Sequence, residues 1–373
     1  MRIALFTETF LPSTDGVVTR LRHTLEELNR MGDEVMVFAP RSGEGPGSYA
    51  GARIHRVHSV PFPPYPQIKL APPHPGVARA LQRFRPDVVH VVNPIILGIG
   101  GVYMARRRKL PLVVSYHTNV ATYASFYSLD FMIGFAKAAT RLVHNQAHIT
   151  LCTSESTMNY LQKEGIKRVR LWPQGVDAHR FRPDLGSKRW RRKLTDEHPN
   201  ERLVLYVGRV ASEKGIERLR EILDEIPDTR LAIVGDGPAR RDLEKVFAGT
   251  RTVFTGTLRG RMLSRAYASA DVFLFPSTTD TLGMAMIEAL ASGLPVVAAR
   301  GGATHEVVAD GESGVIYDPG REGALVEAVR RVLDDEELRE KLGSGARAAA
   351  EERSWERATG TLRGYYEQAR RMA

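Results

Sequence analysis

The sequence has little of several features that define common protein classes. It contains one cysteine, Cys152, in 373 residues. A single thiol excludes a disulfide framework and a cysteine-rich metal site, and it fits a reducing cytoplasm. No apolar run approaches the roughly 20 residues of a membrane-spanning helix. The first residues read as a β-strand without the charged and apolar regions of a secretory signal, so we expect a cytoplasmic protein.

Two familiar phosphate-binding motifs are also missing. The GxGxxG fingerprint does not follow the first expected strand, residues 3–7, and no GxxxxGK[ST] loop occurs. Their absence argues against a nicotinamide dehydrogenase and against an ATPase. No pair of histidines has the spacing of metal ligands, and the acids form no compact triplet. We therefore expect no metal site and no cofactor requirement.

The composition is that of a globular protein, with 43% hydrophobic and 26% charged residues. The chain is too long for one ordinary core, so we expect two domains. The formal net charge is +10. Nucleic acid, anionic lipid head groups and phosphorylated small molecules are the partners that such a charge favours.

Short apolar strands alternate with amphipathic helices in both halves of the chain. We expect strands at residues 3–7, 34–39, 53–57, 87–92, 112–116, 149–153, 168–172, 203–207, 230–234, 253–255, 272–275, 296–298 and 315–317. This alternation predicts an α/β protein with two doubly wound, Rossmann-like parallel sheets. Ligands of such sheets bind at the carboxyl ends of the strands, so the cleft between the halves is the expected site.

Turn residues and a charge run separate the halves at residues 173–200. We expect an N-terminal domain over residues 1–175 and a C-terminal domain over residues 176–373. The last helix, about 356–373, can cross back to the first domain. Residues 61–75 carry many prolines, which exclude a regular helix or a central strand, so we expect a long loop there.

Residues 275–302 read as strand, polar turn, helix and strand. The unpaired N–H groups of a helix that begins at a strand's carboxyl end can bind a phosphate. Gly283 has no side chain, so a ligand can approach the backbone at this helix start. Asp280 precedes the helix start, and Glu288 lies about two turns along it. The structural alternative is that Asp280 is only an N-cap and Glu288 only a solvated helix residue.

A second cluster follows the strand at residues 203–207. Gly208 and Arg209 end this strand, and Lys214 lies five residues beyond the arginine. An arginine and a lysine at this spacing can grip one diphosphate, the first through two parallel hydrogen bonds and the second as a point charge. The alternative is two solvated surface cations.

The first domain offers fewer candidates. Gly16 follows strand one, where its backbone can face a phosphate, although most such glycines only form turns. His117 ends the strand at residues 112–116 among polar neighbours, which suits a sugar pocket better than a core. Glu8 ends strand one and can meet an acceptor hydroxyl.

With these residues in place, the chain resembles a family-four retaining glycosyltransferase of GT-B architecture over nearly its whole length. The resemblance rests on Gly16, His117, Gly208-Arg209 with Lys214, and the stretch from Asp280 to Glu288. The family has two glutamates seven residues apart, and here aspartate replaces the first. Other stretches are similar to sulfoquinovosyldiacylglycerol synthases and to glycolipid mannosyltransferases.

The resemblance implies a UDP- or GDP-sugar donor and no metal. No carboxylate is placed as a covalent nucleophile, so we favour front-face substitution. The residues that the resemblance implies for the reaction are His117, Arg209, Lys214 and Asp280. Those that it implies for donor binding are Gly16, Gly208, Leu282, Gly283, Met284 and Glu288.

The resemblance also implies a lipid acceptor and a peripheral position on the inner face of the cell membrane. Cations at 106–109 and 188–193, together with the aromatic residues of 61–75, suit an anionic membrane surface. Two alternatives stay open: a soluble sugar acceptor, and a sugar-nucleotide epimerase on the same scaffold. The net charge also suggests a nucleic-acid-binding protein, but the sequence lacks a basic stripe interleaved with aromatic residues, so we expect no nucleic-acid partner.

Overall fold

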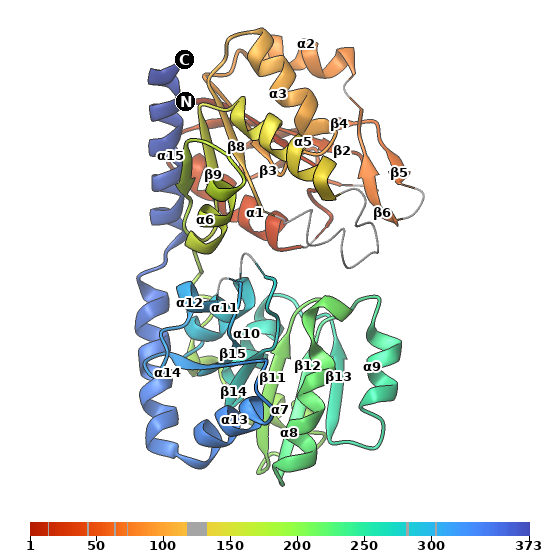
Figure 1. Ribbon diagram of the computed structural model, residues 1–373, viewed down its shortest axis with the longest axis vertical. Coiled ribbons are helices and arrows are strands. Elements are labelled where there is room, and N and C mark those ends of the chain that lie inside the picture. The colour runs from red at the N-terminus through yellow and green to blue at the C-terminus, as the bar shows by residue number, and fades with distance from the viewer. Residues whose placement is uncertain are drawn as a thin grey trace. The chain divides into compact units, whose positions relative to one another are not determined.

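The computed structural model of the protein describes residues 1–13, 15–42, 45–62, 65–72, 74–117, 133–280, 283–302 and 304–373. The chain divides into two compact units (Figure 1). One comprises Met1–Gly175 together with Trp355–Ala373, and the other comprises Val176–Ser354. The last helix, α15 (Trp355–Met372), therefore belongs to the first unit and not to the second.

The main sheet of the first unit has the strand order β10-β9-β8-β7-β1-β2-β4-β3, and it is parallel except for the short edge strand β3. Its strands are β1 (Arg2–Thr7), β2 (Glu34–Pro40), β3 (Ser48–Tyr49), β4 (Ala52–Val57), β7 (Val88–Val92), β8 (Leu112–Ser115), β9 (Ile149–Cys152) and β10 (Val169–Leu171). The chain moves outward in one direction from β1 and in the other direction from β7. The boundary between β1 and β7 is thus a topological switch point, where ligands of such sheets bind.

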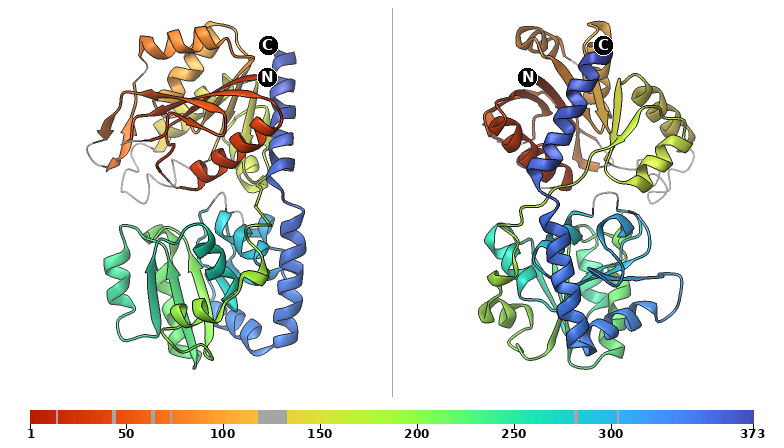
Figure 2. Two further views of the ribbon diagram at one scale, coloured as in Figure 1. Left: turned by 180° about the vertical axis from the view of Figure 1, so that it is seen from behind. Right: turned by 90° about the vertical axis from the view of Figure 1, so that its left-hand side faces the viewer.

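Helices cover both faces of this sheet. They are α1 (Gly16–Arg30), α2 (Pro75–Phe84), α3 (Leu97–Arg107), α5 (Ile133–Asn145), α6 (Glu155–Lys163) and α15. Ile3 and Leu5 of β1 pack in one apolar cluster with α1 and α15, whereas Ala4 and Phe6 pack in another with α2 and α3. Alternate side chains of a strand point to opposite faces, so a strand buried on both faces must be apolar throughout. Figure 2 shows α15 lying along the first unit.

The second unit has the strand order β13-β12-β11-β14-β15-β16, and all its pairings are parallel. Its strands are β11 (Arg202–Val207), β12 (Thr229–Val234), β13 (Thr252–Gly256), β14 (Val272–Phe275), β15 (Val296–Ala299) and β16 (Gly314–Tyr317). Its helices are η2 (Pro183–Leu185), α7 (Lys188–Leu194), η3 (Ser212–Lys214), η4 (Ile216–Leu219), α8 (Arg220–Glu225), α9 (Arg240–Val246), α10 (Arg261–Ala268), α11 (Met284–Ala291), α12 (Thr304–Val307), α13 (Ala324–Asp334) and α14 (Glu336–Glu351). The switch point of this sheet lies between β11 and β14.

The structure corrects our expectation of a plain loop at residues 61–75. Strands β5 (Val60–Phe62) and β6 (Tyr65–Leu70) pair antiparallel as a separate two-stranded ribbon, and α2 begins at Pro75. Proline excludes a strand from the middle of a sheet but not from a ribbon with free edges.

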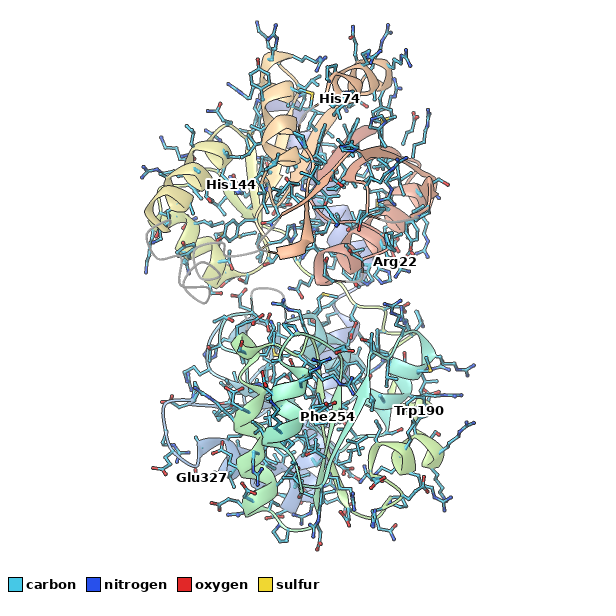
Figure 3. The ribbon with its side chains drawn as sticks, turned by 90° about the vertical axis from the view of Figure 1, so that its right-hand side faces the viewer. Arg22, His74, His144, Trp190, Phe254 and Glu327 are labelled. Atoms are coloured by element: carbon cyan, nitrogen blue, oxygen red, sulfur yellow. The ribbon has the colours of Figure 1, made fainter. Side chains whose placement is uncertain are left out.

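The charge run at residues 188–193 forms α7, the first α-helix of the second unit, as its position after the turn residues predicts. Trp190 within it is buried in the core of this unit (Figure 3). Lys193 lies over the Trp190 ring, 5.0 Å from its centroid. The tryptophan therefore does not offer an aromatic anchor to a membrane. In the described part of the chain, no helix combines the length and apolarity that crossing a membrane requires.

Candidate active site

Lys214 and Asp280 meet at the switch point of the second unit. Lys214 closes the turn η3 that follows β11, and Asp280 lies in the loop after β14. Lys214 Nζ donates a hydrogen bond of 2.6 Å to Asp280 Oδ1. Both side chains are largely shielded, with exposed fractions of 13% and 27%. The structure therefore brings together two residues predicted for the same site and rejects the alternative of a solvated surface lysine.

Arg209 lies on the same loop as Lys214, and its guanidinium forms an ion pair with Glu213. Gly208 is held to β12 by a hydrogen bond from its N–H to the carbonyl of Val234 (3.0 Å). A side chain at Gly208 would meet the hydroxyl of Tyr206 at 2.7 Å, and that hydroxyl donates to the carbonyl of Arg209. The glycine thus permits the close packing that fixes the backbone of Arg209.

Helix α11 begins without a side-chain cap, because its N-cap is Gly283 in the left-handed conformation (φ 56°). Asp280 is paired with Lys214, so the alternative that Asp280 serves only as the N-cap of this helix is wrong. Among the described residues no side chain caps this helix start, so its N–H groups can bind an anion. Met284 is the first residue of the helix and is half-buried. Leu282 lies outside the described residues.

Two glycines support the loop that carries Asp280. A Cβ at Gly302 would lie 2.4 Å from the carbonyl oxygen of Asp280, and one at Gly301 would lie 3.0 Å from that of Thr278. Both glycines have positive φ, which other residues rarely adopt. The loop after β14 therefore rests directly on the backbone that follows β15.

Glu288 is partly buried on α11 and accepts a hydrogen bond of 3.0 Å from the hydroxyl of Tyr267. Burial raises the pKa of Glu288 to about 7, and both the Tyr267 hydroxyl and the charge of Arg180 oppose that rise. A carboxyl with this pKa changes charge near neutral pH. The alternative that Glu288 is only a solvated helix residue is therefore wrong.

In the first unit, Gly16 is the first residue of α1 and is half-buried. The side chain of Asp15 caps this helix by accepting from the N–H of Val18 (2.9 Å). Gly16 follows β1 at the switch point, as predicted from its place after the first strand.

His117 follows β8 and is buried, with 2% of its surface exposed. Its Nε2 lies 2.9 Å from Ser115 Oγ, and its ring packs edge-on against Trp172. Burial, together with the positive charge of Arg20, lowers the pKa of His117 well below its usual value. The imidazole is therefore neutral at physiological pH and can donate one hydrogen bond and accept another.

The structure gives Glu8 a different role from the one expected. Its carboxylate accepts hydrogen bonds from the N–H groups of Ile95 (2.9 Å), Leu97 (3.4 Å) and Gly98 (2.8 Å) at the start of α3. The expectation that Glu8 meets an acceptor hydroxyl is thus replaced by a structural function, that of capping α3.

Two partners in this region escaped the sequence analysis. Glu213 and Tyr267 hold Arg209 and Glu288, respectively. Glu213 lies four residues after Arg209, which is the spacing of an ion pair on a helical turn and was a usable signal. Tyr267 lies on another helix, so no local pattern connects it to Glu288.

Comparison with known families agrees with this architecture. The profile of the family described as Glycosyltransferase Family 4 matches residues 14–180, and that described as Glycosyl transferases group 1 matches residues 188–349. Sulfoquinovosyl transferase SQD2 of Arabidopsis thaliana is 38% identical over 97% of this chain and 72% of its own length. A GDP-mannose-dependent alpha-mannosyltransferase of Mycolicibacterium smegmatis is 38% identical over 98% of this chain and 97% of its own length.

More distant relatives share the fold. An alpha-monoglucosyldiacylglycerol synthase of Streptococcus pneumoniae is 29% identical over 92% of this chain and 82% of its length. Sucrose-phosphate synthase of Thermosynechococcus elongatus has a TM-score of 0.82 at 21% identity, with both chains fully covered. HepE of Anabaena in complex with UDP has a TM-score of 0.79 at 19% identity, covering 99% of this chain and 100% of that one. The chain belongs to the family-four, group 1 glycosyltransferases, enzymes of GT-B fold built from two Rossmann-like units.

Proposed function

We propose that this enzyme is a retaining glycosyltransferase that moves a sugar from a UDP- or GDP-linked donor to a lipid acceptor, such as diacylglycerol or a glycosyl diacylglycerol. The observation that carries the proposal is the meeting of Lys214 and Asp280 at the switch point of the second unit, beside Arg209 and the uncapped start of α11. The names of the relatives supply the chemical class of donor and acceptor.

In this proposal, Lys214 and Arg209 bind the diphosphate of the donor. Lys214 exchanges its bond to Asp280 for a phosphate oxygen, and Arg209 exchanges its bond to Glu213 in the same way. Two fixed cations and the N–H groups of α11 then stabilise the negative charge that develops on the leaving diphosphate. Cations in these positions take the part that a metal ion plays in other transferases, so we expect catalysis without one.

The sugar and the ribose have separate partners in this proposal. Glu288 accepts hydrogen bonds from the ribose hydroxyls, and Asp280 and Gly283 contact the sugar once Lys214 has turned to the phosphate. His117 contacts the sugar near its 6-position. We favour front-face substitution, in which the leaving phosphate takes the acceptor's proton while the new bond forms on the face that the phosphate leaves.

A face of α3 supports membrane binding. Ile99 and Tyr103 are exposed and lie four residues apart, on one line along the helix, and Ile95, also exposed, lies two residues before the helix begins. Arg107 continues this line, and its guanidinium donates to the Tyr103 hydroxyl (3.1 Å). Exposed cations at 106–109 adjoin it. An apolar stripe ending in a cationic cluster is the pattern of a surface that binds anionic lipid.

Two other functions make different predictions. A glycosyltransferase with a soluble sugar acceptor would gain nothing from this face of α3. An epimerase would release altered sugar without any acceptor. The exposed apolar line on α3 favours the lipid acceptor.

The deciding experiment incubates the purified enzyme with a panel of UDP- and GDP-sugars and vesicles that contain diacylglycerol or glycosyl diacylglycerol, with and without a chelator. We expect a glycolipid whose anomeric configuration matches the donor, at a rate that the chelator leaves unchanged. Transfer to soluble sugars alone, or sugar release without acceptor, would refute the lipid acceptor.

A further inference from the structure

A chain of hydrogen bonds runs through the core of the first unit and ends at His117. The hydroxyl of Tyr366 on α15 lies 2.7 Å from His90 Nδ1, and His90 Nε2 lies 3.0 Å from Ser115 Oγ. Ser115 Oγ in turn lies 2.9 Å from His117 Nε2. The chain therefore connects the last helix of the protein with a residue predicted to touch the sugar.

No member of the chain is open to solvent. Tyr366, His90 and Ser115 have no exposed surface, and His117 has 2%. The ring of Trp172 packs edge-on against both imidazoles, with centroids 5.6 Å from His90 and 5.7 Å from His117. Side chains this deeply buried depend on protein groups for most of their hydrogen bonds.

The positions of the protons follow from this constraint. His90 is the one hydrogen-bond partner of the Tyr366 hydroxyl among the described residues, so Tyr366 donates to His90 Nδ1. The His90 proton then sits on Nε2 and is donated to Ser115 Oγ, and Ser115 donates its own hydrogen to His117 Nε2. The reverse order would leave the buried Tyr366 hydrogen without an acceptor, at a cost of about 1–3 kcal/mol.

Burial and a nearby buried cation keep both imidazoles neutral. The Arg20 guanidinium stacks over the Trp172 ring, 3.7 Å from its centroid, and donates to the carbonyls of Trp172 and Pro173. Burial first, and this positive charge second, lower the pKa of His90 to about 3 and that of His117 well below normal. Each ring therefore carries one proton, as the chain requires.

We propose that Tyr366, His90 and Ser115 are positioning residues that fix His117 in the tautomer protonated at Nδ1, so that it offers an N–H donor to a sugar hydroxyl. The catalytic role of these residues rests on the proposed contact between His117 and the donor sugar. The assignment of the tautomer does not depend on that contact, because the hydrogen bonds specify the tautomer in the free enzyme.

Nuclear magnetic resonance of the full-length enzyme with 15N-labelled histidine tests the tautomer without any substrate. Comparison with a His117→Ala spectrum assigns the His117 signals. We expect a protonated Nδ1 and an unprotonated Nε2 in the wild type. In Tyr366→Phe, the chain can reverse, so we expect His117 Nε2 to gain proton occupancy. Ser115→Ala, which cuts the chain next to His117, provides a second variant if Tyr366→Phe does not fold.

Tyr365→Phe is the matched control, because Tyr365 is the neighbouring tyrosine on α15 and donates only to the carbonyl of Leu171 (3.0 Å) among the described residues. We expect the His117 signals to be unchanged in this variant. In the transfer assay, we expect Tyr366→Phe to lower kcat roughly tenfold, the lower end of the range for loss of the outer hydrogen-bond partners of metal-bound histidines, with little change in the donor KM.

A His117 protonated at Nε2 in the wild type would refute the proposed chain of hydrogen bonds. So would His117 signals that are the same in Tyr366→Phe and Ser115→Ala as in the wild type. A shifted tautomer with unchanged kcat would leave the chain intact and refute the contact between His117 and the sugar. Equal losses of kcat in Tyr365→Phe and Tyr366→Phe, with unchanged spectra, would reduce the tyrosines to a packing function.

Discussion

The Nζ atom of Lys214 lies 2.6 Å from Oδ1 of Asp280, and the two residues follow the neighbouring strands β11 and β14. Each compensates the charge of the other at the point where the strand order reverses. A diphosphate bound there would compete with Asp280 for the lysine. The carboxylate would then be released toward the sugar.

Loss of either cation should slow transfer without unfolding the protein. We expect Lys214→Ala and Arg209→Ala each to lower kcat about 100-fold or more, because each removes a charge from the leaving diphosphate. Steady-state kinetics with a labelled donor measures this effect.

Lys245→Ala is the control for Lys214, since Lys245 also pairs with an aspartate, Asp242, at 3.3 Å, but on the exposed surface of α9. Such surface pairs contribute little. We expect this variant to be as active as the wild type. Rates near wild type in both Lys214→Ala and Arg209→Ala would contradict the assignment of these cations to the diphosphate.

Donor binding should depend on pH through Glu288. Its pKa of about 7 means that the carboxylate, which accepts from the ribose hydroxyls, predominates only above neutrality. We expect the donor dissociation constant, measured by calorimetry, to rise as pH falls through about 7. Glu288→Gln should bind the donor more weakly and lose this pH dependence, whereas an unchanged dependence would assign it to another group.

The same raised pKa has a consequence for stability. Glu288 binds a proton more tightly in the folded chain than in the unfolded chain. Its contribution to the free energy of unfolding is therefore fully present below about pH 4.5 and is lost as pH rises through about 7. Urea unfolding should therefore show Glu288→Gln gaining stability relative to wild type between these pH values. A constant difference would contradict the raised pKa.

Gly302 should tolerate a side chain poorly. Its φ of 50° disfavours other residues, and a Cβ there would lie 2.4 Å from the Asp280 carbonyl oxygen. Gly249→Ala is the control, because Gly249 has a φ of 76° and nothing within 4 Å of its Cβ position. We expect backbone strain to lower the free energy of unfolding of both variants by about 1 kcal/mol. The clash should lower that of Gly302→Ala by about 1–3 kcal/mol more.

Thermal unfolding and transfer rates distinguish the two glycine variants. We expect only Gly302→Ala to lower kcat, because only it displaces the loop that holds Asp280. Equal effects in the two variants would show that the contact with Asp280 is unimportant.

Membrane binding should depend on the cations next to α3. Each replacement of Arg106 or Arg107 with glutamine should remove about 1 kcal/mol of the free energy of binding to an anionic surface. We expect vesicle partitioning to fall roughly 30-fold, from the tenfold change per 1.4 kcal/mol. Flotation with vesicles of anionic and of neutral lipid measures it.

Arg189→Gln with Arg192→Gln is the matched control on α7. Both residues are exposed cations of the charge run at 188–193, whose tryptophan is buried. We expect partitioning close to wild type. Equal losses in the two double variants would indicate a diffuse attraction of the positively charged protein rather than a membrane face on α3.

The fold was predictable because its information is local. The interiors of strands such as β1 and β11 are apolar, and the helices between them are amphipathic, which specifies covered parallel sheets. The ribbon of β5 and β6 was not predictable from these rules. Its pairing of Val60 with Leu70 joins residues ten positions apart, which proline content alone does not predict.

The candidate site was predictable in part. Lys214 and Asp280 stood out because each lies in the segment that follows a strand, and parallel strands bring their carboxyl ends to one edge. The partner of Glu288 was not evident, since Tyr267 reaches it from another helix. The role of Glu8 was misassigned for the same reason, because its partners at the start of α3 lie about 90 residues away in the sequence. The roles assigned to these residues in catalysis stay predictions.

A crystal structure of the enzyme with a bound nucleoside diphosphate tests the central proposal most directly. We predict that the diphosphate oxygens lie within hydrogen-bonding distance of Lys214 Nζ and the Arg209 guanidinium, with the ribose hydroxyls on Glu288 and Lys214 released from Asp280. A nucleotide bound elsewhere, with Lys214 still paired to Asp280, would contradict it.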